Sequence, residues 1–300
     1  MNLSLQAIEA RGELYRKLRL FFAERNVKEV STPLLQPASV TDPYLEPIKT
    51  DGGYLQTSPE YAMKQLLVAG SGDIYQICKA FRKEETSKKH RSEFTLLEWY
   101  RLGFDQWDLM ADVADVVEIA IGTSHFEHIS YRQLFLQYLG FDPFTISNKE
   151  LIANAKDTIE IDMPNASRDD WLNLLLSHLI EPLLGQDAPV FIYDYPPTQA
   201  SLAKVNQDEQ GEYVAERFEL YYKGIELCNG YHELTDANEQ RQRFHQDTTQ
   251  RLQMGKQPLP IDYHLLEALE KGLPQCAGVA LGLDRLLMLQ LKITDIADVL

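Results

Sequence analysis

Basic residues crowd one short stretch of this chain, FRKEETSKKHRSEF, which spans residues 81–94. Its basic side chains are Arg82, Lys83, Lys88, Lys89, His90 and Arg91. The whole chain has a formal net charge of −16, which argues against a broad nucleic-acid surface because such surfaces need cations across an entire face. A local cluster can still bind a small anion, and the planar arginine fork suits phosphate and carboxylate oxygens. The stretch therefore predicts a site for a ligand the size of a nucleotide.

Two glutamates near a lysine-glycine pair form a second candidate site. In RFELYYKGIEL, a two-residue turn at Lys223-Gly224 would place Tyr221 opposite Glu226. Glu219, two residues before Tyr221, would then lie on the same strand face. Mg²⁺ is usually bound by one or two carboxylates together with substrate phosphates. The pair is therefore a candidate magnesium site, although two carboxylates alone are a weak signal.

The strand that follows this turn is expected to lose its alternation near Gly230. Such a break would bring Asn229, Tyr231 and Glu233 to the mouth of one pocket. These side chains could then bind a polar substrate.

A third candidate is GVALGLDR, residues 278–285. Gly278 and Gly282 allow a close approach of the backbone, and Asp284-Arg285 opens an apolar helix. The segment has neither G-x-G-x-x-G nor the phosphate-binding G-x-x-x-x-G-K-[ST] pattern. It therefore favours a glycine-spaced strand that leads into a helix, not a dinucleotide fingerprint.

A long hairpin must position the first site. The period of two in IYQICKAFRKE and in EFTLLEWYRL predicts two strands joined by the charged loop. One face of the second strand would carry Phe94, Leu96, Glu98 and Tyr100, with Trp99 facing away. Arg82 and Glu84 would share a face of the first strand. The alternative interpretation of these charges is a solvated sheet face with cross-strand ion pairs.

The remaining elements predict the α+β class, with an antiparallel sheet flanked by helices. Residues 3–25 form an amphipathic helix that includes Ile8, and the prolines of 27–50 favour an edge strand with extended connections. A helix over Tyr61–Ala69 starts at Ser58-Pro59-Glu60, with serine as N-cap and proline at the first helical position. Further helices are expected at Trp107–Ile121, Tyr131–Leu139, Arg168–Leu184 and Ala237–Leu252, and strands at 188–196, 217–230 and 277–285. We expect one domain over residues 1–300 with a mainly helical insertion at about 105–186.

Other single features favour ordinary structural roles. Cys78, Cys228 and Cys276 lie far apart without a C-x-x-C pattern, so we expect buried reduced thiols. His125 and His128 are spaced to bind metal on a helix, but a solvated pair is expected because no third ligand is evident. Trp107 and Trp171 are expected in the core or an interface. No leader and no apolar run of ~18–20 residues is evident, so a cytoplasmic location without membrane association is expected.

These motifs, in this order, resemble the class II aminoacyl-tRNA synthetases. Pro33 matches the proline of the first family motif, FRKE with HRSEFTLLEWY resembles the second, and GVALGLDR resembles the third. The nearest resemblance is to lysyl-tRNA synthetase, and it covers nearly the whole chain. Its characteristic elements match Ser58-Pro59-Glu60, Arg217-Phe218-Glu219, Glu226–Leu234 and Gly278–Arg285.

The expected absence of an anticodon-binding domain indicates which group of lysyl-tRNA synthetase relatives the chain resembles. Lysyl-tRNA synthetases carry an N-terminal OB-fold that binds the anticodon, whereas the predicted catalytic helix begins here within the first ten positions. The chain thus resembles the truncated lysyl-tRNA synthetase paralogues, a family that activates (R)-β-lysine and attaches it to a lysine side chain of elongation factor P. The resemblance also implies ATP, Mg²⁺, a homodimer formed through the N-terminal helix and the Pro33 strand, and no stable binding of tRNA.

The resemblance assigns roles residue by residue. Arg82 and Arg285 would be catalytic, with Arg82 on the α-phosphate and the substrate carboxylate. The expected ATP-binding residues are Arg82, Glu84, His90, Arg91, Phe94, Glu226, Leu227, Gly282 and Arg285. The expected amino-acid pocket consists of Ser58, Pro59, Glu60, Glu98, Tyr100, Asn229, Tyr231, Glu233 and Ala280. Glu219 and Glu226 would bind magnesium.

The sequence departs from the synthetase pattern at two positions. Arg91 stands where the loop usually has asparagine, so we expect a phosphate contact there, and Ala280 replaces a glycine. Two alternatives stay open: a stand-alone enzyme that charges tRNA or activates lysine for another acceptor, and a catalytically dead synthetase-like regulatory module. The intact Arg82, Glu219 and Arg285 argue against the second.

Overall fold

The computed structural model describes residues 5–83 and 86–299, which divide into two compact units. Unit 1 combines Met1–Ser124 with Gly230–Leu300, and unit 2 is His125–Asn229. The boundaries between the two units lie at residues 124/125 and 229/230, whereas the expected insertion spans about 105–186. The single domain over residues 1–300 with a mainly helical insertion therefore stays a prediction. Both units contain helices and mainly antiparallel strands, so the predicted α+β class is confirmed.

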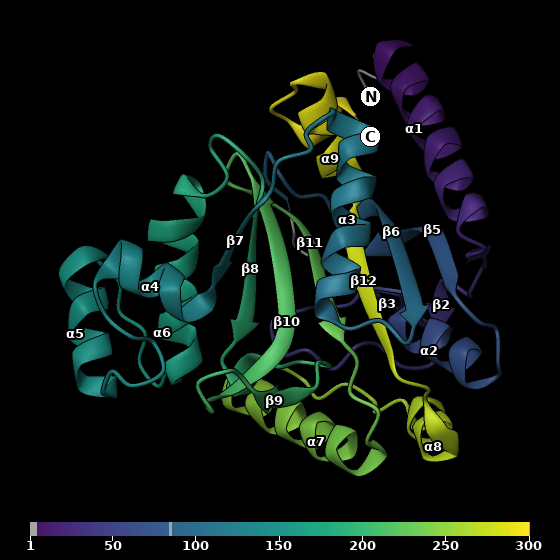
Figure 1. Ribbon diagram of the computed structural model, residues 1–300. Helices are drawn as coiled ribbons and strands as arrows, with labels where there is room; N and C mark the ends of the chain where they lie inside the picture. Colours follow the sequence, from purple (N-terminus) through teal and green to yellow (C-terminus); the bar gives the residue numbers. More distant parts are fainter. Residues whose placement is uncertain (1–4, 84–85, 300) are drawn as a thin grey trace. The chain divides into compact units, whose positions relative to one another are not determined.

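The sheet of unit 1 contains the predicted hairpin. Strand β5 (Ile74–Phe81) pairs antiparallel with β6 (Glu93–Leu102), and β6 pairs antiparallel with β12 (Cys276–Gly282). The short β1 (Lys28–Glu29) adds a parallel edge strand to β5, as expected for the proline-rich segment. A small second sheet is made by β2 (Leu35–Gln36), β4 (Gly53–Leu55) and β3 (Lys49–Thr50). Figure 1 shows β5, β6 and β12 side by side.

The helices of unit 1 are α1 (Leu5–Glu24), α2 (Glu60–Val68), α3 (Gln106–Ile121), α7 (Ala237–Gln253), α8 (Tyr263–Gly272) and α9 (Leu283–Leu291). Helix α1 packs on α3 and α9, while α8 packs on α2 and α7. The sequence analysis missed α8. A short 3₁₀ turn, Ile296–Asp298, follows α9. No helix in residues 5–83 and 86–299 combines the length and apolarity needed to cross a bilayer.

The core of unit 1 forms where α1 covers the sheet. Phe22 stacks on Tyr75 with ring centroids 4.2 Å apart and meets the edge of Trp99 at 5.7 Å. Trp99 is fully buried against Phe22 of α1. Strand alternation predicted that it would lie on the opposite face of β6 from Glu98 and Tyr100. Each such buried aromatic contributes about 1.5–3 kcal/mol by leaving water. Ile8 was expected on the apolar face but is 54% exposed, so that assignment is wrong.

Unit 2 contains five strands of the larger sheet, β7 to β11, and three α-helices, within the described residues. Strands β7 (Glu127–Ser130) and β8 (Val190–Tyr195) are parallel, β8 and β9 (Val205–Gln207) pair antiparallel with β10 (Tyr213–Tyr222), and β11 (Ile225–His232) continues the chain into unit 1. The helices are α4 (Tyr131–Leu139), α5 (Asn148–Thr158) and α6 (Arg168–Leu175), with one π and two 3₁₀ turns at Leu176–Ile180, Glu181–Leu183 and Pro197–Gln199. Each helix starts at a capping box, which satisfies its first amides. The sequence analysis missed β7 and α5, and it took Arg168–Leu184 as one helix.

Several single-residue expectations are corrected here. His128 lies in β7 and stacks on Phe191, so the two histidines do not share a helix. Trp171 is buried as expected, whereas Trp107 is 47% exposed. All three cysteines are free; Cys228 and Cys276 are buried and Cys78 is half-buried.

Candidate active site

Three carboxylates gather around one buried lysine in unit 1. Lys64 lies one helical turn after Glu60 on α2, and its Nζ is 2.7 Å from Glu60 Oε1. The same Nζ is 2.5 Å from Glu233 Oε2. Lys64 and Glu233 are both 1% exposed, and charges buried so deeply must be paired to be tolerated. The helix start and the end of β11 are therefore held together by this lysine.

Glu98, from the middle of β6, is the third carboxylate. Tyr100 donates a hydrogen bond to Glu98 Oε1 at 2.9 Å, and Ser58 Oγ donates one to Oε2 at 2.8 Å. Glu98 and Tyr100 thus share one strand face, as predicted. Burial raises the pKa of Glu98 to about 8, and the nearby Glu60 carboxylate adds to the rise.

Ser58 is part of this cluster, but it is not the N-cap of α2. The N-cap position is Pro59, which follows it, and Glu60 is the first helical residue. Ser58 Oγ still accepts from the Glu60 amide at 3.1 Å. The predicted cap is therefore shifted by one residue, and the serine hydroxyl links the helix start to β6.

Gly278 lets Tyr100 and Glu233 approach one another. β12 pairs Gly278 opposite Tyr100 and Ala280 opposite Glu98. A methyl group on Gly278 would lie 2.2 Å from Tyr100 Cε1 and 2.6 Å from Glu233 Oε1. This Oε1 atom is buried and accepts no hydrogen bond within the described part of the chain. Burial raises the pKa of Glu233, with Lys64 acting in the opposite direction. A buried acceptor that faces the pocket is what an incoming ammonium group needs.

Lys64 is the residue of this cluster that the sequence analysis missed. Glu60, Glu98, Tyr100 and Glu233 were predicted as pocket residues, and the structure brings all four together. The i, i+4 spacing of Glu60 and Lys64 is a signal for a helical ion pair and could have identified the first contact. The second contact, to Glu233, joins residues far apart in sequence.

Arg82 and Phe94 lie together at the other end of the hairpin. The guanidinium carbon of Arg82 is 5.0 Å from the Phe94 ring centroid, within cation–π distance. The Arg82 amide donates to Ser92 O at 2.9 Å, one residue beyond the end of β5. Glu84 lies outside the described residues, so the face that it was expected to share with Arg82 stays a prediction.

His90 and Arg285 are in direct contact. Arg285 Nη2 is 2.7 Å from His90 Nε2, and the other ring nitrogen, Nδ1, is 2.9 Å from Ser87 Oγ. A guanidinium can only donate, so Nε2 is the acceptor and Nδ1 carries the proton. Two of the predicted nucleotide ligands, from the loop and from α9, are thus brought to one place.

Arg91 already has partners in this structure. Its Nη2 is 2.9 Å from Asp295 Oδ1, and its Nη1 donates to the carbonyl oxygens of Ser87 and His90. The amide of Ile296 also donates to Lys88 O at 2.9 Å, so the loop is attached to the turn after α9. A phosphate contact by Arg91 stays a prediction, and it would compete with the Asp295 ion pair.

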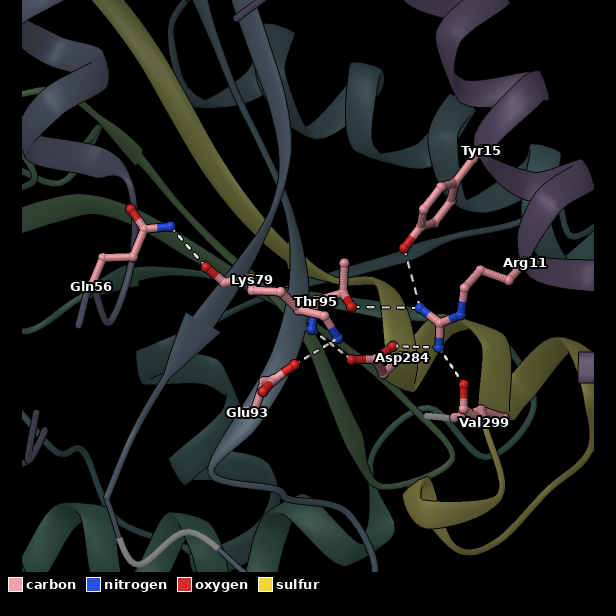
Figure 2. A network of polar contacts seen from close by, with 8 residues as sticks. All are labelled: Arg11, Tyr15, Gln56, Lys79, Glu93, Thr95, Asp284 and Val299. Atoms are coloured by element: carbon pink, nitrogen blue, oxygen red, sulfur yellow. Dashed lines mark hydrogen bonds and ion pairs between the residues drawn. The ribbon is translucent and has the colours of Figure 1, made fainter. Parts of the chain in front are cut away.

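Asp284 anchors the strand-to-helix segment that carries Arg285. Figure 2 shows its carboxylate between Thr95 and Arg11. Asp284 Oδ2 accepts from the Thr95 amide at 2.6 Å, and Oδ1 accepts from Arg11 Nη2 at 2.7 Å. Gly282, at the junction of β12 and α9, has room around it, since a methyl group there would meet nothing closer than Arg285 Cδ at 3.6 Å. Helix α1 is therefore connected to the start of α9 through a buried carboxylate.

Within unit 2, Glu219 sits at the centre of a second polar network. The hydroxyls of Tyr195 and Tyr221 each donate to its Oε2 at 2.7 Å, and Arg217 Nη2 pairs with its Oε1. Arg217 Nε also donates to Asn229 Oδ1 at 3.1 Å. Glu219 and Tyr221 therefore share a strand face, as predicted.

The predicted turn between β10 and β11 is confirmed. Lys223 and Gly224 have φ angles of 53° and 66°, the left-handed conformation at both central residues that a tight hairpin turn requires. Strand β11 then runs through Asn229 and Gly230 to His232, and the loss of alternation expected near Gly230 stays a prediction. Leu227 is buried in this strand, at 1% exposure.

Glu219 and Glu226 have the carboxylate oxygens that magnesium prefers, but they do not form a complete coordination site by themselves. Burial is the largest cause of the raised pKa of the Tyr221 hydroxyl and of the Cys228 thiol, and the charges of Glu219 and Glu226 add to both rises, so both carboxylates act on one region. No group of three or more His, Cys, Asp or Glu side chains that could hold a metal ion occurs among the residues that the structure describes. Both Glu219 oxygens accept from neighbours. A metal would therefore need substrate phosphates to complete its ligands.

Comparison with known proteins agrees with this geometry. The family model for tRNA synthetases class II (D, K and N) matches residues 2–300. A protein of Vibrio parahaemolyticus named elongation factor P--(R)-beta-lysine ligase is 48% identical to this chain, with 99% of this chain and 95% of that protein covered. Proteins of the same name from Photobacterium profundum and Pectobacterium atrosepticum are each 46% identical and cover 99% and 97% of this chain. The chain therefore belongs to the class II tRNA synthetase family that includes the aspartate, lysine and asparagine enzymes.

Proposed function

We propose that this protein is an AMP-forming ligase that activates (R)-β-lysine with ATP and transfers it to a lysine side chain of elongation factor P. One observation carries the amino-acid part of the proposal: three carboxylates and Tyr100 lie together in a buried cluster in which Glu233 Oε1 has no hydrogen-bond partner among the described residues. Such a cluster suits a substrate with two ammonium groups. The acceptor and the isomer come from the name shared by the relatives.

The first reaction step would take place where Arg82 lies. The substrate carboxylate attacks the α-phosphorus of ATP in line, an aminoacyl adenylate forms, and pyrophosphate leaves. Arg82 would bind the carboxylate and the α-phosphate and stabilise the developing charge. Phe94 would stack on the adenine, while His90, Arg91, Arg285, the backbone at Gly282 and Glu84 would bind the rest of the nucleotide.

The second step needs no covalent intermediate with the enzyme. A neutral lysine amine of elongation factor P attacks the carbonyl carbon of the adenylate, AMP leaves, and the new amide loses a proton. We propose that Glu60 and Glu233 bind the substrate ammonium groups, and that Ser58, Pro59, Glu98, Tyr100, Asn229, Tyr231 and Ala280 complete the pocket. The ammonium groups would then be held away from the reacting carboxylate.

Glu219 and Glu226 are the proposed magnesium residues. When bound, Mg²⁺ would neutralise charge on the phosphates and on the departing pyrophosphate. In this structure Arg217 pairs with Glu219 and thereby holds its carboxylate in place. Leu227 lies in β11 next to Glu226, and its role in binding the nucleotide stays a prediction.

A homodimer through α1 is part of the proposal. Helix α1 exposes Leu5, Ile8 and Leu20 at 70%, 54% and 52%. A second copy of the chain would remove these apolar side chains from water. Sedimentation of the wild type and of Leu20→Asp would test this, and a monomeric wild type would refute it.

One experiment tests the function. The purified protein is incubated with ATP and (R)-β-lysine, together with either elongation factor P or tRNA, and the mass of each acceptor is measured. We expect elongation factor P to gain one β-lysyl group and tRNA to stay unchanged. A gain of mass by tRNA alone would favour a tRNA-charging enzyme, and no pyrophosphate exchange with any diamino acid would favour a catalytically dead module.

A further inference from the structure

Lys64 has no role in the chemistry proposed above, although it lies at the centre of the amino-acid pocket. Its side chain is 2% exposed and contacts Glu60 from α2 and Glu233 from the end of β11. A lysine side chain loses much rotamer freedom when it is fixed, so a buried lysine needs strong partners. The two carboxylates supply them.

We infer that Lys64 is a positioning residue for amino-acid activation: it keeps Glu60 and Glu233 oriented so that Glu233 Oε1 faces the distal ammonium group of a diamino acid. This inference rests on the proposed function, because it concerns the binding of that substrate.

The atoms used by Lys64 support this role. It contacts Glu60 Oε1 and Glu233 Oε2, which leaves Glu233 Oε1 on the side of Gly278. Glu98 is held differently, since Ser58 and Tyr100 each donate to one of its oxygens. The position of Glu233 therefore depends on Lys64, whereas that of Glu98 does not.

The charges of the pocket lead to the same conclusion. With all three carboxylates ionised, the cluster and Lys64 would carry a formal charge of −2, and a substrate with two ammonium groups would balance this charge and favour the ionised carboxylates. Among the described residues, the other titratable groups that face the cluster are Tyr100, Tyr61 beside Glu60, Cys276 beside Glu233 and Lys64, and Cys78 beside Glu98. Without Lys64, three carboxylates would share one buried site with no cation, and they could not all stay ionised. Glu233 would then lose both its fixed orientation and its charge.

The test compares Lys64→Met with the double variant Lys64→Met/Glu60→Gln in ATP–pyrophosphate exchange from pH 6 to 9. The double variant removes one buried carboxylate together with the lysine, so the formal charge of the pocket stays at −2. We expect the KM for (R)-β-lysine to rise at least about tenfold in both variants and its pH profile to shift in Lys64→Met. The KM for ATP should change less than about twofold.

Arg251→Met is the matched control. Arg251 is also buried, at 1% exposure, and it pairs with Glu46 at 2.8 Å outside the pocket. This variant should lower the melting temperature without a selective change in the KM for the diamino acid. Comparing Arg251→Met with Lys64→Met separates the effect of losing any buried cation on stability from the effect of losing Lys64 on the binding of the diamino acid.

Three results would overturn the inference. The first is an unchanged KM for (R)-β-lysine in folded Lys64→Met. The second is an equal rise of the KM values for ATP and amino acid. The third is wild-type KM in the double variant, which would mean that Lys64 only balances charge. If Lys64→Met does not fold, the double variant decides by comparison with Glu60→Gln alone: an equal KM for (R)-β-lysine in the two would overturn the inference, and a higher KM in the double variant would support it. Failure of the proposed function gives another pattern: exchange by the wild type without transfer to elongation factor P refutes the acceptor alone, and no binding of any diamino acid refutes both proposals.

Discussion

Gly278→Ala places a methyl group where Tyr100 and Glu233 already meet. The added carbon would lie 2.2 and 2.4 Å from two ring carbons of Tyr100 and 2.6 Å from Glu233 Oε1. Carbon atoms in contact are normally ~3.5–4.0 Å apart, so the ring or the carboxylate must move by more than an ångström. Neither side chain is a flexible surface group, since Tyr100 is 2% and Glu233 is 1% exposed.

The cost of this change divides between stability and binding. Overpacking a closed site costs about 1–3 kcal/mol of unfolding free energy. If the Tyr100 ring moves, its hydrogen bond to Glu98 weakens, and a typical hydrogen bond contributes about 0.5–1.5 kcal/mol. If Glu233 moves, the pocket loses its acceptor for the substrate ammonium. We therefore expect the KM for (R)-β-lysine to rise by about ten- to a hundredfold, since each factor of ten corresponds to about 1.4 kcal/mol.

Gly282→Ala on the same strand is the control for stability and for the KM of the diamino acid, but not for the KM of ATP, because Gly282 belongs to the proposed nucleotide site. Its methyl group would meet Arg285 Cδ at an ordinary 3.6 Å, and the φ of Gly282, −74°, is accessible to alanine. Its unfolding free energy should change by less than about 0.5 kcal/mol. Urea denaturation and ATP–pyrophosphate exchange measure both quantities. Gly278→Ala with the stability and amino-acid KM of the wild type would show that Tyr100 and Glu233 do not define the pocket.

The remaining predictions concern ionisation, metal, isomer choice and tRNA. Because burial raises the pKa of Glu98 from 4.5 to about 8, its stabilising contribution is complete below about pH 4.5 and is lost as the pH rises to about 8. Urea titrations without ligand should show this decline between pH 5 and 8, and a Glu98→Gln variant with the same slope would contradict it. Glu226→Gln should nearly abolish magnesium-dependent pyrophosphate exchange with an unchanged circular dichroism spectrum; full activity would remove the metal assignment. Ala280, which lies opposite Glu98, should favour β-lysine over α-lysine. Ala280→Gly should therefore raise kcat/KM for α-lysine relative to β-lysine by up to about ten- to two-hundredfold. An unchanged ratio of the two kcat/KM values would show that other residues determine the selectivity. With a net charge of −16, the protein should bind tRNA only weakly in a filter assay, and submicromolar, salt-sensitive binding would refute this.

Local sequence patterns predicted the elements that carry the site. Alternation over residues 74–102 predicted β5 and β6, because side chains of one strand face recur every second residue. The Lys223-Gly224 pair predicted the hairpin turn, because a two-residue turn of this kind needs positive φ at both central residues and glycine adopts positive φ without strain. Weak patterns failed: the short strand β7 was hidden among helical segments, and α5 and α8 were missed.

Which side chains would share a pocket was predicted only in part. Glu98 and Tyr100 are two residues apart on one strand, so their common face follows from sequence. Glu60 and Glu233 were assigned by resemblance, and the structure joins them through Lys64. The partners of Arg91 could not be predicted, because Asp295 comes from a turn more than two hundred residues later.

The sequence by itself determined the chemistry that is available: a basic loop, a glycine-spaced strand that leads into Asp284 and Arg285, and scattered acidic residues, all within recognisable family motifs. Helix and strand periods are local, because they arise from hydrogen bonding between near neighbours along the chain or along a hairpin. The tertiary structure decided the register that sets Gly278 against Tyr100 and the packing that buries Lys64 between two carboxylates. These contacts form only when segments that are far apart in sequence pack together and exclude water. A charged side chain that is buried between such segments needs a partner, and the other segment supplies it.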